Sequence, residues 1–431
     1  MTARRVAVTG VGALTGYGRG VDALWNGLAS GASAVREHRA RMGRRNWVSY
    51  PMAALPFDTT EICRALPNGQ FVEQNALAVD PDLVAIADAV GQAISDARLT
   101  YDPRENDVGL VVTHESPGLA PHVQGFFQWG RLGRAWLRSR SRFSPPDFLY
   151  EQQSDSVYRL HSFLYLHYLS AVFQLHGFTL YNNNACASGA FALVVAADRV
   201  RSGEVEAVVV AGGDVPEDGT KYRWFRERGL YSEDGLCRPF SARRDGMVLG
   251  SGSAALVLED LDKARAAGKR IYAEWLGGGF TSDGWKVTMP DVVGDRYRQA
   301  IDRALASARL RPEDVTLLAP HGLGAQLLDH FEAESLARVF GGGGRPWPAL
   351  LPLKGALGHT LGGCVLVETV AALLALERGE IPAAARCPDP DPRLPIGRSR
   401  EEGFAEDWVL LKCTNGFAGQ NGAIVLRKPL D

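Results

Sequence analysis

Residues 181–210, YNNNACASGAFALVVAADRVRSGEVEAVVV, carry the pattern from which the rest of the chain can be interpreted. The stretch predicts the end of a buried strand, a tight turn that carries Cys186, and a helix of very small residues. Small neighbours such as Ala185 and Ala187 leave room for a helix start deep in a core. A cysteine at a helix N-terminus lies at the positive end of the macrodipole, which favours the thiolate. We therefore expect Cys186 to be a nucleophile that forms an acyl-enzyme, the alternative being a structural cysteine in a packing helix.

Composition narrows the class of protein. A chain of 431 residues is too long for one simple core, so we expect two domains or two fused halves. A hydrophobic fraction of 46% and 48 glycines favour a tightly turned α/β protein, and a net charge of −2 does not suggest a nucleic-acid binder. The six cysteines form no C-x-x-C pair, so we expect neither a metal site nor a disulfide framework. No apolar run approaches the roughly 18 residues of a membrane span, and we expect a cytoplasmic protein without a membrane partner.

The N-terminal segment predicts a strand at residues 5–9, followed by a loop containing Gly10, Gly12 and Gly16. The glycine spacing misses the dinucleotide-binding fingerprint by one residue. Apolar periodicity predicts a helix over residues 82–97. These features place no cofactor at the N-terminus.

The segment near residues 120–175 has an unusual composition. Between Phe126 and Tyr181 lie 14 aromatic residues in 56, with a cluster of arginines over residues 131–142. One interpretation is a packed helical insertion with an exposed basic loop. The other, which we prefer, is that residues 121–170 line or cap a substrate pocket.

Two segments suggest an internal duplication. The helix beginning near Cys186 ends in RSGE, and the later stretch 362–380, GGCVLVETVAALLALERGE, is equally rich in small residues and ends in RGE. The spans from Cys186 to Gly203 and from Gly362 to Gly379 are the same length. Equal length and equal endings favour a repeat of one structural unit.

Two histidine motifs complete the set of candidate catalytic residues. His321-Gly322 follows the apolar segment 315–319 and precedes Asp329 and Glu332. The second motif, KGALGH at residues 354–359, leads into the small-residue helix that contains Glu368. A soft nucleophile together with neutral imidazoles that donate to a developing oxyanion is suited to acyl chemistry.

On these motifs the chain resembles the β-ketoacyl-ACP synthases, the ketosynthases of the thiolase superfamily. Over nearly its whole length the motifs occur in family order: NACASG, RPFSARRDGMVLGSG, TSDGW, HG, KGALGH and TNGFAGQNG. The resemblance implies a thiolase-like five-layer αβαβα fold built from two duplicated halves. We place the halves at residues 1–260, with Cys186 and the aromatic-rich insertion, and 261–431, with both histidine motifs.

The resemblance also implies a role for individual residues. Cys186 would accept the acyl chain, and the backbone N–H groups of Cys186 and Phe417 would form an oxyanion hole. His321 and His359 would hold the thioester carbonyl of the second substrate. Lys354 would tune the histidines in contact with Glu332, Glu368 would orient the His359 loop, and Phe417 would gate the acyl pocket. Thr281 and Ser282 lie in the region that binds the phosphopantetheine arm of a carrier protein, which enters as a substrate and not as a permanently bound cofactor.

Some positions depart from the family pattern. Leu323 and Ala325 stand where two threonine hydroxyls usually bind the pantetheine arm, and Gly355 replaces a serine. The catalytic set is therefore kept while the arm-binding region is changed, which places ordinary malonyl extension in question.

Three functions follow from this resemblance. The first is a specialised-metabolism ketosynthase that forms a carbon–carbon bond by Claisen-type condensation in polyketide- or fatty-acid-like synthesis. The second is intramolecular cyclisation or acyl transfer of the tethered chain. The third is a non-catalytic chain-length partner, which the presence of Cys186, His321 and His359 disfavours. We expect an acyl carrier protein as partner, and a homodimer or a heterodimer with a related subunit.

Overall fold

A computed structural model describes residues 4–41, 47–123, 125, 154–291, 295–341, 346–397 and 407–429. Eleven strands form one sheet: β1 (Val6–Thr15), β2 (Gly18–Arg19), β5 (Gly109–Thr113), β6 (Thr179–Asn182), β7 (Ala207–Asp214), β8 (Gly252–Asp260), β9 (Ala273–Ser282), β10 (Leu317–Ala319), β11 (Ala349–Leu350), β12 (Val409–Gly416) and β13 (Gln420–Arg427). Strands β3 (Arg36–Arg41) and β4 (Trp47–Met52) pair separately. The helices are α1 (Val21–Ala29), α2 (Thr59–Arg64), α3 (Gly69–Gln74), α4 (Pro81–Asp96), α7 (Phe163–Phe173), α8 (Ser188–Ser202), α9 (Thr220–Arg226), α10 (Leu261–Ala266), α11 (Arg296–Ala308), α12 (Gln326–Phe340), α13 (Lys354–Leu357) and α14 (Cys364–Arg378).

The order of the strands shows that the fold is duplicated. One half of the sheet runs β6-β5-β7-β8-β1 and the other runs β11-β10-β12-β13-β9, so the two halves have the same order counted along the chain. Directions also match, because β5 is parallel to β6 and β7, and β10 is parallel to β11 and β12. The last strand of each half along the chain, β8 or β13, is antiparallel to both of its neighbours in the sheet. Pairing of β1 with β9 at Val6–Val8 joins the halves, and the prediction of two duplicated halves is confirmed.

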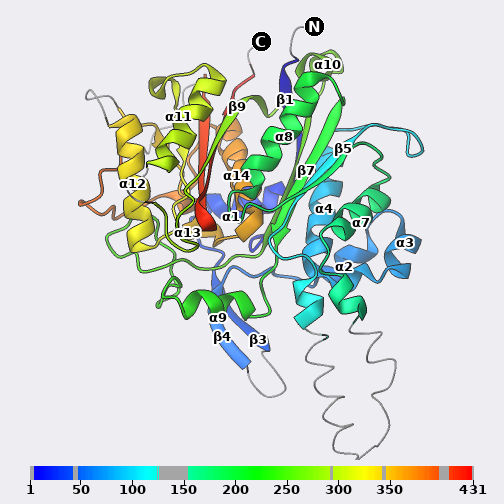
Figure 1. Cartoon of the computed structure of the whole chain (residues 1–431), viewed down its shortest axis with the longest axis horizontal. Helices are drawn as coiled ribbons and strands as arrows, with labels where there is room; N and C mark the ends of the chain where they lie inside the picture. Colours follow the sequence, from blue (N-terminus) through cyan, green and yellow to red (C-terminus); the bar gives the residue numbers. More distant parts are fainter. Residues whose placement is uncertain are drawn as a thin grey trace, which may run out of the picture.

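The helices complete a five-layer arrangement (Figure 1). Helices α8 and α14 lie at the centre, where α8 contacts strands of both halves. Helix α4 packs on the outer face of β1, β7 and β8, and α11 packs on the outer face of β9 and β13. The β3–β4 hairpin projects beyond these layers with α9 beside it (Figure 1), and Tyr50 stacks on Tyr222 with ring centroids 4.1 Å apart. The predicted αβαβα class is therefore confirmed.

Helices α8 and α14 are the repeated unit that the sequence suggested. Each ends in a glycine with positive φ, Gly203 at 79° and Gly379 at 67°. The N–H of each following glutamate bonds back to the helix, Glu204 to the Arg199 carbonyl and Glu380 to the Ala375 carbonyl. This is the Schellman arrangement, which requires a residue that tolerates a left-handed backbone. The shared ending R-S-G-E or R-G-E is therefore a helix stop used twice.

The N-terminal strand is longer than the sequence suggested. Strand β1 continues from Val6 through Gly10 and Gly12 to Thr15, so these two glycines do not punctuate a loop. A Cβ atom at Gly10 would lie 2.3 Å from the Ala93 carbonyl oxygen, and one at Gly12 would lie 2.2 Å from that of Ala89. The glycines thus let helix α4 approach the strand closely. In sequence, glycines with this packing role cannot be told apart from glycines in a turn.

Part of the aromatic-rich segment belongs to the outer core. Helix α7 packs on α3, α4, β5 and β6, and its Tyr165 is buried with its hydroxyl donating to Asp80 Oδ2 at 2.9 Å. Residues 124 and 126–153 lie outside the described part of the chain, so the prediction that 121–170 caps a pocket stays a prediction for them. Within the described residues, none of the helices that the structure contains is long and apolar enough to cross a membrane.

Candidate active site

Cys186 lies between the end of β6 and the start of α8, at the centre of the molecule. Ala185, directly before it, has φ of 50°, so the turn bends sharply at a small residue. The Cys186 Sγ atom lies 3.0 Å from Nε2 of His359 and accepts the backbone N–H of Phe417. The carbonyl of Cys186 accepts from Thr414 Oγ1 at 3.1 Å and from Cys364 Sγ at 3.2 Å. Both ends of the nucleophile are therefore held by residues of the second half.

The ionisation of Cys186 differs from the sequence expectation. Helix α8 begins two residues later, at Ser188, and the side chain is buried. Burial raises the pKa of the Cys186 thiol well above its ordinary value, and Cys364 and Glu115 raise it further. The expected stabilisation of the thiolate by the helix dipole is therefore outweighed by desolvation, and the group is a thiol beside a histidine.

The two histidines come from separate loops and meet edge to face. His321 follows β10, His359 follows α13, and their ring centroids are 5.5 Å apart at 86°. Burial lowers the pKa of each imidazole well below its usual value, and the nearby Lys354 ammonium lowers both further. Both rings are neutral at pH 7. Nδ1 of His359 has no hydrogen-bond partner among the described residues.

The charged residues beneath the histidines are paired differently from the expectation. Lys354 Nζ donates to Glu368 Oε1 at 2.6 Å and to the His321 carbonyl at 2.6 Å, and it lies 3.5 Å from His321 Nδ1. Lys412, which the sequence did not single out, binds the other oxygen of Glu368 at 2.5 Å. Glu368 is therefore shared by two lysines, one of which, Lys354, begins the segment that leads to His359. The predicted contact of Lys354 with Glu332 is replaced by this pair, because Glu332 is occupied elsewhere.

Two carboxylates of α12 brace the His321 loop. Glu332 accepts the backbone N–H groups of His321 at 2.6 Å and Gly322 at 2.7 Å, and also accepts the Tyr297 hydroxyl. Asp329 accepts the N–H groups of Leu323 and Gly324. Gly322 has φ of 51° and Gly324 has φ of 82°, so the loop adopts a backbone that glycine favours. The HG motif is thus a loop whose backbone is held in place by hydrogen bonds to the two acidic residues downstream.

A narrow cavity, partly open to solvent, leads to the sulfur. Its walls include Leu323, Phe417 and residues 287–290, with both histidines beside Cys186. The Phe417 ring packs against Trp224 and against Phe225, which also lines the cavity, with centroid distances of 5.8 Å and 5.7 Å.

Three residues predicted to bind the substrate arm are not in this wall. Ala325 is buried in the cluster that contains Leu323 but does not line the cavity. Thr281 lies on β9, and its hydroxyl donates to the Arg296 carbonyl at 2.6 Å. Ser282, the last residue of β9, is exposed to solvent. None of the three lines the cavity beside Cys186, and their binding of the substrate arm stays a prediction.

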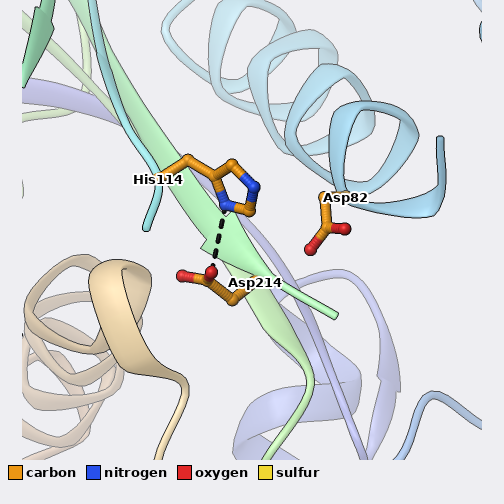
Figure 2. Close-up of side chains that lie close together, drawn as sticks. All are labelled: Asp82, His114 and Asp214. Atoms are coloured by element: carbon orange, nitrogen blue, oxygen red, sulfur yellow. Dashed lines mark ion pairs between the residues drawn. The ribbon is translucent and has the colours of Figure 1, made fainter. Parts of the chain in front are cut away.

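A second buried polar cluster lies close to the site. Figure 2 shows Asp82 from α4, His114 after β5 and Asp214 at the end of β7 pointing toward one another. His114 Nδ1 lies 3.1 Å from Asp214 Oδ1 and 2.7 Å from the Gly213 carbonyl oxygen. Asp214 Oδ2 accepts the Gly362 N–H at 2.9 Å, in the loop that follows His359. The cluster thus supports the loop that carries the second histidine.

The same three residues have the chemistry of metal ligands, with one atom of each within 4.8 Å of the others. Their ligand atoms are already engaged, however: Lys221 Nζ lies 3.3 Å from Asp214 Oδ1, and Asp82 Oδ1 accepts the Val215 N–H at 2.5 Å. Burial opposes charge on His114, but Asp214 raises its pKa to about 9. The protonated His114 and Lys221 supply the positive charge that a metal ion would bring, so the cluster is an ion-pair network.

The sequence missed several residues that shape the site. Lys412 has a visible signal, since it is a lone charge in the apolar strand VLLKCTNG. Asp214 likewise ends the apolar run AVVVAGG. Thr414 and Cys364 carry no signal of their own, because only the packing of the two halves brings them to the Cys186 carbonyl.

Comparisons with known proteins agree with this geometry. Residues 3–124 and 166–264 match the family described as Beta-ketoacyl synthase, N-terminal domain, and residues 272–387 match Beta-ketoacyl synthase, C-terminal domain. The unmatched residues 125–165 fall within the aromatic-rich segment.

Individual relatives cover most of the chain. It is 28% identical over 409 residues to Nodulation protein E of Rhizobium leguminosarum bv. trifolii, which covers 90% of each sequence. It is 27% identical over 411 residues to the mitochondrial 3-oxoacyl-(acyl-carrier-protein) synthase of Arabidopsis thaliana, over 90% of this chain and 85% of that protein. Its fold matches AntDE, the ketosynthase of a type II polyketide synthase in complex with its acyl-carrier protein AntF, with a TM-score of 0.78, 23% identity and coverage of 99% and 100%. The family matches, together with the strand order and the Cys186–histidine geometry, lead to one conclusion: the chain belongs to the β-ketoacyl synthase family.

Proposed function

We propose that this chain is a condensing enzyme that carries an acyl group as a thioester on Cys186 and forms a carbon–carbon bond. The observation that carries the proposal is the 3.0 Å approach of Cys186 Sγ to His359 Nε2, with His321 beside it, at the inner end of an open cavity. Nucleophile, base and second imidazole are then within reach of one reacting carbonyl.

The loading step follows from the protonation states. Because Cys186 is a thiol and His359 is neutral, His359 Nε2 accepts the thiol proton as Sγ attacks the thioester carbonyl of the incoming acyl group. Negative charge develops on the carbonyl oxygen, where the N–H groups of Cys186 and Phe417 would stabilise it. The C–S bond to the carrier arm then breaks, and the departing thiolate takes the proton from His359. The products are acyl-Cys186 and a free phosphopantetheine thiol.

The condensing step uses the histidines as donors. With both imidazoles neutral, each ring can present one N–H to the thioester oxygen of a malonyl-type unit. Loss of CO2 leaves the electron pair as an enolate, which these donors stabilise. The enolate carbon attacks the acyl carbonyl, and the bond to Cys186 Sγ breaks. A partner acyl carrier protein supplies both substrates through its phosphopantetheine arm.

A second candidate function is favoured by one specific feature. Leu323 presents an apolar side chain to the cavity beside His321, so a pantetheine arm gains no side-chain hydrogen bond there. A chain already attached to Cys186 does not need a second arm. Intramolecular cyclisation or acyl transfer of the tethered chain is therefore the alternative. A non-catalytic chain-length subunit is disfavoured, because such a role requires neither the thiol nor its contact with His359.

Intact-mass measurement with candidate acyl-carrier thioesters tests the loading step. Wild-type protein should gain the mass of the acyl group, and Cys186→Ala should not. Alanine fits this turn between Ala185 and Ala187, so circular dichroism and thermal unfolding of the variant should match the wild type. An acyl mass gain on Cys186→Ala would overturn the assignment of the nucleophile.

The fate of the loaded chain separates the two enzymatic functions. Acyl-loaded protein is divided in two, and malonyl carrier protein is added to one half. A β-ketoacyl product only in that half supports condensation, whereas release or cyclisation in both halves supports the alternative. Sedimentation of the protein alone tests the expected homodimer, for which a monomer would be the contrary result.

A further inference from the structure

Lys412 is a buried charge to which the reaction steps proposed above assign no role. It lies in the middle of β12, between Leu411 and Cys413, and its side chain is completely buried. Burying an ammonium among apolar neighbours is costly by several kcal/mol unless its hydrogens are bonded and its charge is paired. A lysine at this position therefore needs specific partners.

Three acceptors surround the Lys412 ammonium. Its Nζ atom lies 2.5 Å from Glu368 Oε2, 2.9 Å from the Cys413 carbonyl oxygen and 3.2 Å from the Pro320 carbonyl oxygen. An ammonium has three hydrogens, so its donor capacity is used completely. The Pro320 contact ties β12 to the residue directly before His321.

Lys354 makes the matching set of contacts on the other side of the same carboxylate. It binds Glu368 Oε1 and the His321 carbonyl, each at 2.6 Å. The two lysines thus share Glu368 and hold the consecutive carbonyls of Pro320 and His321. The three side chains form one unit beneath the catalytic loop, and each is at most 3% exposed.

The unit has a net charge. Two ammonium groups and one carboxylate leave one positive charge, buried and close to both imidazoles. Other charged groups face the histidines: Glu332 bonds the N–H groups of His321 and Gly322, and Asp214 and Lys221 act on His359 from the neighbouring cluster. A nearby cation opposes protonation of an imidazole.

We propose that Lys412 is a positioning residue that holds the His321 loop through Pro320 and adds, to the effects of burial and Lys354, a positive charge that disfavours protonation of both catalytic imidazoles. The inference rests on the proposed condensing function only where it concerns catalysis, because the condensing step requires neutral imidazoles as hydrogen-bond donors. The positioning and the charge themselves are properties of the free protein. They can therefore be measured without any acyl substrate.

A series of charge variants tests the proposal, with [13C]histidine NMR as the readout. Lys412→Gln keeps amide donors for the carbonyls and brings the net charge of the unit to zero. Glu368→Gln brings it to plus two, and the double variant restores plus one. Signals of His321 and His359 are assigned with His321→Gln and His359→Gln. Lys269→Met removes a lysine that pairs with Glu259, outside the Lys354–Glu368–Lys412 unit, and serves as the control.

The expected shifts have opposite signs. Lys412→Gln should raise the titration midpoints of both histidines by about one to two pH units, the effect of one charge several ångströms away at an effective dielectric constant of about 20. Glu368→Gln should lower them, and the double variant and Lys269→Met should leave them near the wild-type position. Unchanged midpoints in either folded single variant would overturn the proposal. If one single variant fails to fold, the other still gives a signed shift.

A change in activity separates this inference from the proposed function. In a condensing enzyme, the acidic limb of the pH profile in Lys412→Gln should move upward by the same amount as the NMR midpoints. NMR shifts without any condensation in wild-type protein would leave the Lys412 inference standing and refute the proposed function. Condensation by the wild-type protein, with unshifted histidine midpoints in Lys412→Gln, would support the proposed function and refute the Lys412 inference.

Discussion

At the scale of the residue, the reactivity of Cys186 depends on its burial. Its thiol has a pKa raised above the ordinary value near 9, so the thiolate is a small fraction at neutral pH. We expect iodoacetamide labelling of Cys186 to be slow at pH 7 and to rise about tenfold per pH unit beyond pH 8, because only the thiolate is alkylated. Intact-mass measurement at a series of pH values gives the extent of labelling. The Cys186→Ala variant gives the background from other cysteines, such as the partly exposed Cys387. Fast labelling that does not vary with pH would show that the thiolate is stabilised after all.

The departure at Leu323 gives a second prediction at this scale. Leu323→Thr places a hydroxyl in the cavity wall beside His321, where one hydrogen bond to the arm is typically worth about 1 kcal/mol. Malonyl-carrier turnover should therefore rise by roughly threefold to tenfold. Ala325→Thr is the matched control and should not increase turnover, because Ala325 does not line the cavity. Equal effects of the two substitutions would mean that the arm enters by another path.

At the scale of the element, the two central helices depend on a glycine at their contact. A Cβ atom at Gly189 in α8 would lie 2.9 Å from Val365 Cβ in α14. Gly189→Ala should therefore destabilise the protein by about 1–3 kcal/mol, since the overpacked helices must move apart. Urea unfolding measures the difference. Gly69→Ala in α3, where a Cβ atom meets nothing within 4 Å, should be neutral or slightly stabilising.

At the scale of the whole molecule, the buried Asp82–His114–Asp214 network links stability to pH. Burial opposes charge on His114, but Asp214 and Asp82 raise its folded pKa to about 9 from an ordinary value of 6.5. Its contribution to stability is fully present below pH 6.5 and is lost as the pH rises through 9, with a size of about 3 kcal/mol.

The wild type minus His114→Gln difference in unfolding free energy isolates this contribution. It should be largest at pH 6 and shrink by pH 9.5, because glutamine can still donate to the Gly213 carbonyl but carries no charge. Chemical unfolding at a series of pH values gives the curve. A difference that grows with pH would mean that His114 is buried as a neutral ring.

Local patterns in the sequence indicated an α/β protein with a repeated unit and singled out the candidate reacting residues, and the family resemblance that these motifs carry implied the five-layer fold. Small residues around Cys186, the repeated helix endings and the two histidine loops all depend on short-range chemistry. The structure confirms the duplicated architecture and brings Cys186, His321 and His359 together. A helix stop, a glycine turn and a buried strand can be recognised locally, because each is a property of a few consecutive residues.

Only the tertiary structure decided which charges meet and which side chains face the cavity. Glu368 pairs with Lys354 and with Lys412, which lies 44 residues further along the chain, and neither spacing nor composition indicates that pair. Thr281, Ser282 and Ala325 lie near the motifs yet do not line the cavity. The ionisation of Cys186 was also decided here, because desolvation depends on everything packed around the sulfur while the helix dipole depends on one neighbouring turn.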